Sequence, residues 1–134
     1  MLRQRLPYAF DKEHERFIRT LFCVVCGDNT SVETAHVSYP DPRFDKRPRG
    51  RGERTGAWVV PLCSRHHRES HTPQRGVVYV PGQTWEQLWW WTFANIDPHA
   101  VAAALLLYSG DAERCERVLE WWKIRKILTI GPQE

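Results

Sequence analysis

The sequence predicts an α+β fold that forms one domain over residues 1–134. Its length is that of one ordinary domain, which leaves no room for an independent second core. Two short β-branched stretches lie in the first half of the chain, and helical patterns fill residues 84–130. We therefore expect a core over residues 11–72, with an N-terminal helix, and a tryptophan-rich helical extension over residues 84–130.

The composition excludes several classes of protein. Hydrophobic residues make up 42% of the chain and charged residues 26%, which is typical of a globular protein and not of a disordered one. The longest apolar run, Ala100–Tyr108, has nine residues, whereas a membrane-spanning helix needs about 20. Because the N-terminus lacks the apolar stretch of a secretory signal, we expect a cytoplasmic protein whose four cysteines are metal ligands or core thiols.

The first half of the chain predicts one helix and two strands. Asp11 is placed to cap the helix, and Ser31–Val37 alternates in part, as a strand does. Ala57–Leu62 is expected to form the second strand, which Pro61 ends, and the β-branched run Gly76–Val80 one more. The predicted helix carries apolar residues at helical spacing, namely Phe17, Ile18, Leu21 and Phe22.

Capping signals predict three helices in the second half. Thr84 begins a capping-box pattern that opens the tryptophan-rich helix. Asp97 precedes a proline at the first position of the next helix, and Gly110 would end that helix. A last helix is expected from Asp111 to about Leu128.

Four residues have the spacing of a closed zinc site. Cys23 and Cys26 form a Cys-x2-Cys pair, and Cys63 with His66 forms a Cys-x2-His pair, 37 residues after Cys26. Two residues between ligands allow one turn to hold a metal from two sides, and two such pairs complete a tetrahedral site. A structural zinc ion there would contribute directly to folding. The alternative is two unrelated pairs of buried residues.

A short helix is expected after Cys63, with Ser64 as its cap and Pro73 as its stop. In such a helix His67 and His71 are four residues apart on one face, a spacing that suits a shared cation. His66 is rotated by about 100° from His67, toward Cys63. One short helix is therefore expected to serve two metal ions.

Together these motifs resemble those of the HNH (His-Me finger, ββα-metal) endonucleases, and in particular the phage and prophage branch that includes the RecA-dependent HNH nuclease. The resemblance covers residues 11–72, about half of the chain. It implies a zinc-stabilised, treble-clef-like ββα-metal core in a bacterial or phage-infected cell. The matching segments are Asp11-x2-His14-x2-Phe17-Ile18-Arg19, the Cys-x2-Cys pair, Ala35-His36-Val37 and Val60-Pro61-Leu62-Cys63-x2-His66-His67-x3-His71.

The resemblance implies metal-dependent hydrolysis of DNA phosphodiester bonds. His36 would be the general base that takes a proton from the attacking water. His67 and His71 would bind a divalent ion (Mg²⁺, Mn²⁺, Ni²⁺ or Zn²⁺) that stabilises the leaving 3′ oxygen. An imidazole, with an ordinary pKa of about 6.5, suits the first task, and a metal held by few protein ligands suits the second.

Two positions depart from the family pattern. Many HNH enzymes have a histidine or aspartate metal ligand immediately before the base, where this chain has Ala35. The asparagine of the motif would fall near Trp58, where none is present. A third ligand for the catalytic ion and the residue that orients the base therefore have no assignment by resemblance. Candidates in the loop between the strands are Asp41, Asp45 and Glu53.

Positive charge is concentrated between the two predicted strands. The stretch Arg43–Arg54 has six basic residues and two acidic ones, a net charge of +4, whereas the whole chain has +3. Such a segment, extended by prolines and glycines, is expected to track a phosphate backbone, and the alternative is an ordinary solvated loop. The expected DNA contacts are Arg43, Lys46, Arg47, Arg49, Arg51 and Arg54.

Aromatic residues are concentrated in the C-terminal region and lie on more than one face of the first helix there. Packing between helices, or an interface with a protein partner or a second copy, is the favoured role, and stacking on exposed bases is the alternative. The residues are Trp85, Trp89, Trp90, Trp91, Phe93, Trp121 and Trp122.

Three further residues are expected to be structural. His14 packs within the first helix and His99 lies in the first turn of a later one. Cys115 is a core thiol, because it begins an apolar stripe of the last helix. The stripe consists of Cys115, Val118, Leu119 and Trp122.

Three functions are consistent with these motifs. A metal-dependent HNH endonuclease gives a role to His36, His67 and His71 alike. A zinc-stabilised nucleic-acid-binding module without chemistry needs none of the three. A phage accessory protein would dock through its tryptophan-rich helices on a recombination or packaging protein. The endonuclease is the leading hypothesis, because it explains the most residues.

Overall fold

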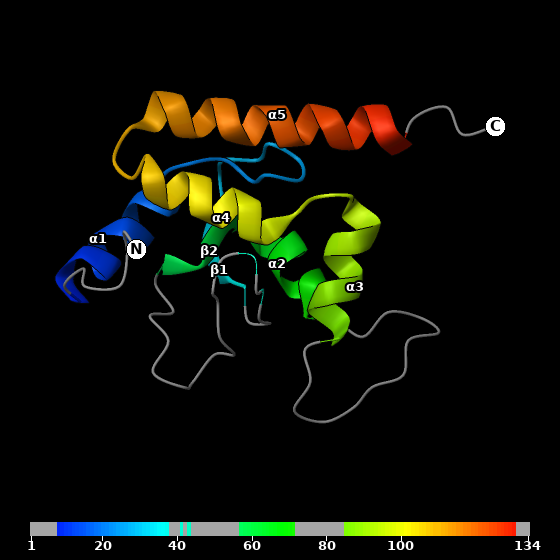
Figure 1. Ribbon diagram of the computed structural model, residues 1–134, viewed down its shortest axis with the longest axis horizontal. Helices are drawn as coiled ribbons and strands as arrows, with labels where there is room; N and C mark the ends of the chain where they lie inside the picture. The colour runs from blue at the N-terminus through cyan, green and yellow to red at the C-terminus, as the bar shows by residue number, and fades with distance from the viewer. Residues whose placement is uncertain (1–7, 38–40, 42, 44–56, 72–84, 131–134) are drawn as a thin grey trace.

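In the computed structural model the chain forms a two-stranded hairpin with helices around it (Figure 1). The structure describes residues 8–37, 41, 43, 57–71 and 85–130. Within these ranges the fold is mixed α+β, as predicted. The elements in chain order are α1 (Tyr8–Ile18), β1 (Val32–His36), β2 (Val59–Cys63), α2 (Ser64–Ser70), α3 (Trp85–Ala94), α4 (Pro98–Leu107) and α5 (Ala112–Ile130).

The hairpin and the helix that follows it are the centre of the fold. β1 and β2 pair in antiparallel register, with Val32 opposite Cys63 and His36 opposite Val59. The N–H of Val37 donates to the carbonyl of Trp58 at 2.9 Å, which continues the ladder by one step. α2 begins at the residue after β2, so the order is strand, strand, helix.

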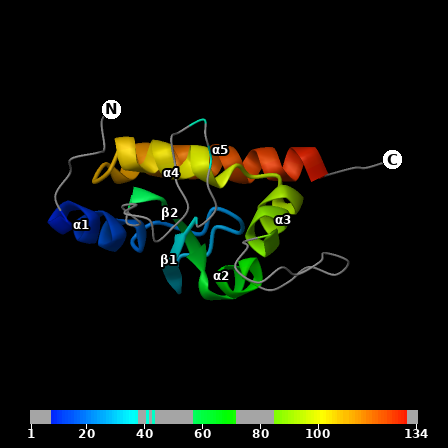
Figure 2. The ribbon, with the colours of Figure 1, turned by 60° about the horizontal axis from the view of Figure 1, so that its bottom comes forward.

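Helices cover the hairpin from several sides. Both views show α4 and α5 lying together above the strands, α1 at one end and α3 at the other (Figures 1 and 2). α1 and α2 each contact both strands, α4 contacts β2 and α5, and α3 contacts α2. β2 is buried along its whole length because elements pack on both of its faces.

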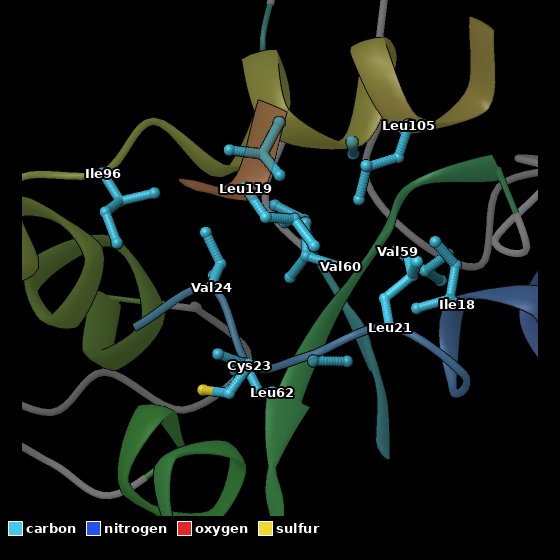
Figure 3. Close-up of a cluster of buried hydrophobic side chains, with 14 of the residues drawn as sticks. Ile18, Leu21, Cys23, Val24, Val59, Val60, Leu62, Ile96, Leu105 and Leu119 are labelled. Atoms are coloured by element: carbon cyan, nitrogen blue, oxygen red, sulfur yellow. The ribbon is translucent and has the colours of Figure 1, made fainter. Parts of the chain in front are cut away.

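The centre of the core lies between β2 and the C-terminal helices α4 and α5 (Figure 3). Leu105 of α4 and Leu119 of α5 point toward Val60 of β2, and all three side chains are fully buried. The sulfur of Cys23 lies at the margin of this cluster, on the side of α2. Cys23, a candidate metal ligand, therefore lies at the edge of the apolar core.

Pro61 lies inside β2, so the prediction that it ends the strand is wrong. It is opposite Thr34 in a non-hydrogen-bonded pair, so its nitrogen faces away from β1 and the proline removes no hydrogen bond of the ladder. Its carbonyl accepts a hydrogen bond from the N–H of Val24 at 3.2 Å. The segment with the first cysteine pair is thus attached to the edge of β2 that β1 leaves open.

Two helix boundaries differ from the prediction. α1 begins at Tyr8, so Asp11 lies in the first turn of the helix and is not its cap. The helix ends at Ile18. The N–H of Leu21 then donates to the carbonyl of Ile18 at 3.1 Å, in a turn that buries Leu21 without continuing the helix. Ser64 is the first residue of α2, and its predicted capping place is taken by Cys63 without a side-chain hydrogen bond.

Other local predictions are confirmed. Asp97 caps α4, because its side chain accepts a hydrogen bond from the N–H of Ala100 at 3.2 Å. The boundary at Gly110 is the exception: α4 ends at Leu107 with Tyr108 as its C-cap, and Gly110 lies in the turn that follows, where its φ of +90° favours glycine. The stripe of the last helix faces the core, with Cys115 and Leu119 fully buried. Positions 73, 76–80 and 84, which carry further predictions, lie outside the described residues.

The two histidines expected to be structural are both buried. Nδ1 of His14 lies 2.7 Å from Oγ of Ser109, which connects α1 to the turn after α4. His99 packs edge-on to Trp58, with ring centroids 5.8 Å apart. Among the described residues no helix is both long and apolar enough to cross a membrane.

A cluster of charges attaches part of the inter-strand loop to α4. Nη2 of Arg43 lies 2.5 Å from Oδ2 of Asp41 and 2.9 Å from Oδ2 of Asp97. Nδ1 of His99 lies 3.3 Å from Oδ2 of Asp41. The hydrogen bonds from Arg43 hold the pKa of Asp41 below its ordinary value. Asp41, Asp97 and His99 bring their ligand atoms within 4.8 Å of one another. The guanidinium of Arg43 already neutralises the two carboxylates, so we interpret the cluster as an anchor of the loop on α4 and not as a metal site.

We predict that Asp97→Ala lowers the free energy of unfolding by about 1–2 kcal/mol, because it removes both the helix cap and a partner of Arg43. Asp97→Asn keeps a good capping side chain and loses only the ion pair, so its loss should be smaller. Chemical denaturation of the two variants measures the difference. Equal losses would show that the cap contributes nothing.

Candidate metal centre

The two predicted zinc pairs converge on one point. Cys23, Cys26, Cys63 and His66 bring their ligand atoms within 4.8 Å of one another. Nδ1 of His66 lies 3.3 Å from Sγ of Cys63 and 3.7 Å from Sγ of Cys23, and the sulfurs of Cys26 and Cys63 are 3.9 Å apart. Zinc bonds of about 2.3 Å to sulfur and 2.0 Å to nitrogen give ligand separations of about 3.5–3.8 Å around a tetrahedron. The cluster therefore fits a zinc ion.

Local backbone geometry explains why the first pair forms a tight turn. The N–H of Gly27 donates to the carbonyl of Cys23 at 2.8 Å, and the N–H of Cys23 donates to the carbonyl of Asp28 at 2.9 Å. Gly27 has a φ of +82°, which a residue with a Cβ adopts at a cost. The turn thus brings the two thiols of the first pair together.

The second pair is positioned by the junction of β2 and α2. Cys63 is the last residue of the strand, and His66 lies in the first turn of the helix. The N–H of Ser64 donates to the carbonyl of Ser31 at 2.9 Å, which fixes the start of α2 against the residue before β1. The ring of His66 also packs near Trp90 of α3, at 6.1 Å between centroids.

Burial raises the pKa of the Cys23 thiol to about 11 in the metal-free protein. Without a cation this thiol therefore keeps its proton at neutral pH. A zinc ion binds the thiolate, so binding must release that proton and becomes weaker as the pH falls.

α2 presents its other two histidines away from this cluster, as the helical spacing predicted. The rings of His67 and His71 are 5.4 Å apart between centroids, and one quarter of the His67 side chain is exposed. Nδ1 of His67 lies 2.7 Å from Oε1 of Glu33 on β1. The two imidazoles are therefore close enough to contribute ligands to one cation.

His36 lies at the end of β1 and faces α1. Its Nε2 is 3.6 Å from Oε2 of Glu15, and 26% of its side chain is exposed. Thr34, two residues earlier and on the same face of the strand, donates to the carbonyl of Glu15 at 3.1 Å. Glu33 is on the opposite face. Among the residues that the structure describes, no cluster of three or more candidate ligand atoms contains His36, His67 or His71.

The sequence did not single out the two carboxylates that contact these imidazoles. Glu33 is two residues before Ala35 and so lies on the same strand face, and this alternation is a signal that the sequence offers. Glu15 had no such signal, because its contact depends on how α1 packs against the hairpin. Of the three candidates proposed from the loop, Asp41 belongs to the anchor described above, and Asp45 and Glu53 lie outside the described residues.

The structure describes one of the six predicted DNA contacts. Arg43 is 61% exposed but pairs with two carboxylates, so its charge is used within the protein. The other five lie outside the described residues, namely Lys46, Arg47, Arg49, Arg51 and Arg54.

The aromatic residues divide between core and surface. Trp90 and Trp91 are buried and pack edge-on, with ring centroids 4.9 Å apart, in agreement with the packing interpretation. Phe93 and Trp121 are more than half exposed. Trp121 and Trp122 line a shallow pocket on α5 with Arg117.

No protein-family model, curated protein or solved structure matches the chain.

We predict that Cys26→Ser lowers the zinc content of the purified protein well below one ion per chain and lowers its melting temperature, because it removes one of four ligands. Cys115→Ala is the matched control, since Cys115 is a buried thiol outside the cluster. Elemental analysis and thermal denaturation measure both effects. A full zinc complement in Cys26→Ser would rule out this four-ligand site.

Proposed function

We propose that the protein is a metal-dependent endonuclease of the HNH type that hydrolyses DNA phosphodiester bonds. The observation that carries the proposal is the division of α2 into two faces. His66 contributes to a Cys3His cluster on one face, and His67 and His71 form a partly exposed imidazole pair on the other. The helix directly follows a hairpin whose first strand ends in a third histidine, His36.

The imidazole pair fits a divalent cation by its chemistry and its spacing. His67 and His71 would hold the ion through ring nitrogens, which suit Mn²⁺, Ni²⁺ or Zn²⁺ and can also serve Mg²⁺ through water. When bound, the ion would supply the positive charge that stabilises the phosphate and the leaving 3′ oxygen.

The general base in this proposal is His36. Its partial exposure allows a water molecule to reach the ring. Glu15 would accept a hydrogen bond from Nε2–H and so leave the lone pair on Nδ1 to take the proton of that water. The carboxylate would also stabilise the imidazolium that forms. The present separation of 3.6 Å is long for such a bond, and catalytic hydrogen bonds often shorten when substrate binds.

The basic segment would bring DNA to the site. Its positive charge lies in the connection between β1 and β2, which begins just after His36. Contacts of this kind add affinity and fix the position of the DNA without reading its sequence. We assign them to the five basic residues other than Arg43, because Arg43 is paired with Asp41 and Asp97.

A nucleic-acid-binding module without cleavage is the second candidate. The observation that favours it is the alternation of β1, which turns His36 toward α1 and Glu33 toward α2. In that case the α2 pair would bind a cation without a base beside it.

Cleavage of supercoiled plasmid tests the proposal. We expect nicking that requires Mg²⁺, Mn²⁺ or Ni²⁺ and that EDTA abolishes. His36→Ala should lower the rate by about 100-fold or more, the contribution typical of a general base. His36→Ala must keep its zinc content and circular dichroism for the comparison to hold. Binding in gel shifts without cleavage of duplex, single-stranded or branched DNA would favour the second candidate.

A separate prediction concerns the orientation of the base. Glu15→Gln should lower the rate of cleavage by about 10-fold, because the amide stabilises a charged imidazole less well than a carboxylate does. Glu13→Gln makes the same change of charge on an exposed residue of α1 and should leave the rate unchanged. Equal rates in the two variants would remove Glu15 from the mechanism.

A further inference from the structure

The carboxylate of Glu33 contacts His67, the first residue of the histidine pair on α2. We propose that Glu33 is a positioning residue: it accepts a hydrogen bond from Nδ1–H of His67 and thereby directs the lone pair of Nε2 toward the bound cation. The inference rests on the proposed function, because it names the nitrogen of His67 that binds the catalytic ion. The contact itself is 2.7 Å between Nδ1 and Oε1.

The hydrogen-bonding capacity of the two groups determines the tautomer. An ionised carboxylate only accepts hydrogen bonds, and a neutral imidazole has one N–H and one lone pair. With Nδ1 facing Glu33 at 2.7 Å, the proton must lie on Nδ1. The lone pair is then on Nε2, which is the only nitrogen of that ring able to bind a metal. Carboxylates placed behind metal-binding histidines act in this way.

The register of the hairpin keeps the two residues together. Glu33 is opposite Leu62, which is fully buried, and α2 begins two residues after Leu62. His67 is therefore held beside the part of β1 that carries Glu33. A shift of one residue in the register would turn Glu33 to the face of α1. Burial of Leu62 opposes such a shift.

The position of the pair agrees with a role at a site. Half of the Glu33 side chain and one quarter of the His67 side chain are exposed. Ion pairs with that much exposure contribute little to stability. The main consequence of the contact is thus the orientation of the imidazole, whose neighbour along the helix is His71 at 5.4 Å between ring centroids.

Two measurements on the zinc-loaded full chain test the inference. Long-range ¹H–¹⁵N correlation spectra, without added Mn²⁺, report which nitrogen of His67 carries the proton. Titration with Mn²⁺ reports the affinity for the cation, and His67→Ala identifies the site being titrated. We expect the Nδ1–H form in the parent and a smaller fraction of it in Glu33→Gln, because the amide is a weaker acceptor than the carboxylate and can also turn its NH2 group toward the ring. The Mn²⁺ affinity of Glu33→Gln should fall by about 10- to 100-fold, the range typical when such a partner is removed.

Glu69→Gln is the matched control. Glu69 is an exposed carboxylate of the same helix, two residues after His67 and so about 200° around the helix from it. This variant should keep both the tautomer and the Mn²⁺ affinity of the parent. An equal loss of Mn²⁺ affinity in Glu69→Gln would show that the removal of any negative charge near the site lowers the affinity. That outcome would overturn the proposal.

The remaining outcomes separate this inference from the proposed function. If the parent cleaves DNA and Glu33→Gln keeps both the tautomer and the Mn²⁺ affinity, the positioning role is wrong and the endonuclease stands. If affinity falls while the tautomer is unchanged, Glu33 is a direct ligand and not a positioning residue. If the parent cleaves nothing but both readouts depend on Glu33, the positioning role stands and the endonuclease is wrong.

Discussion

The convergence of a cysteine turn on the junction between β2 and α2 is the constraint on which the rest of the site depends. A hairpin of two short strands is marginally stable by itself. Here the turn that carries Cys23 attaches to the open edge of β2 through Pro61, and its sulfur approaches the first turn of α2. A zinc ion in this cluster would fix the rotation of α2 about its axis, and that rotation decides where His67 and His71 point.

Local chemistry was predicted well from the sequence. The two strands and the capping role of Asp97 follow from residue preferences within a few positions, and each is confirmed. The convergence of the two zinc pairs was also predictable, because ligand spacing reflects the geometry of one turn. The errors at Asp11, Pro61 and Ser64 concern where elements begin or end, which packing decides and propensity does not.

The contacts of the site could not be read from spacing alone. Glu15 meets His36 because α1 packs across the end of the hairpin, and Arg43 meets Asp97 across 54 positions of sequence. Both contacts join segments that are distant in the sequence and meet through tertiary packing. Glu33 is different, because the period of two in a strand is sufficient to place it on the same face as Ala35.

Two imidazoles of the proposed mechanism, the base His36 and the metal ligand His67, each have a carboxylate at one ring nitrogen. The two carboxylates come from different elements of the fold. Glu15 lies on α1 and contacts His36, whereas Glu33 lies on β1 and contacts His67 of α2. Because opposite faces of β1 serve the two pairs, a phosphate bound at α2 would have to reach the end of β1 for His36 to act on its water. The end of the strand is the place where this is feasible, because His36 is the last residue of β1.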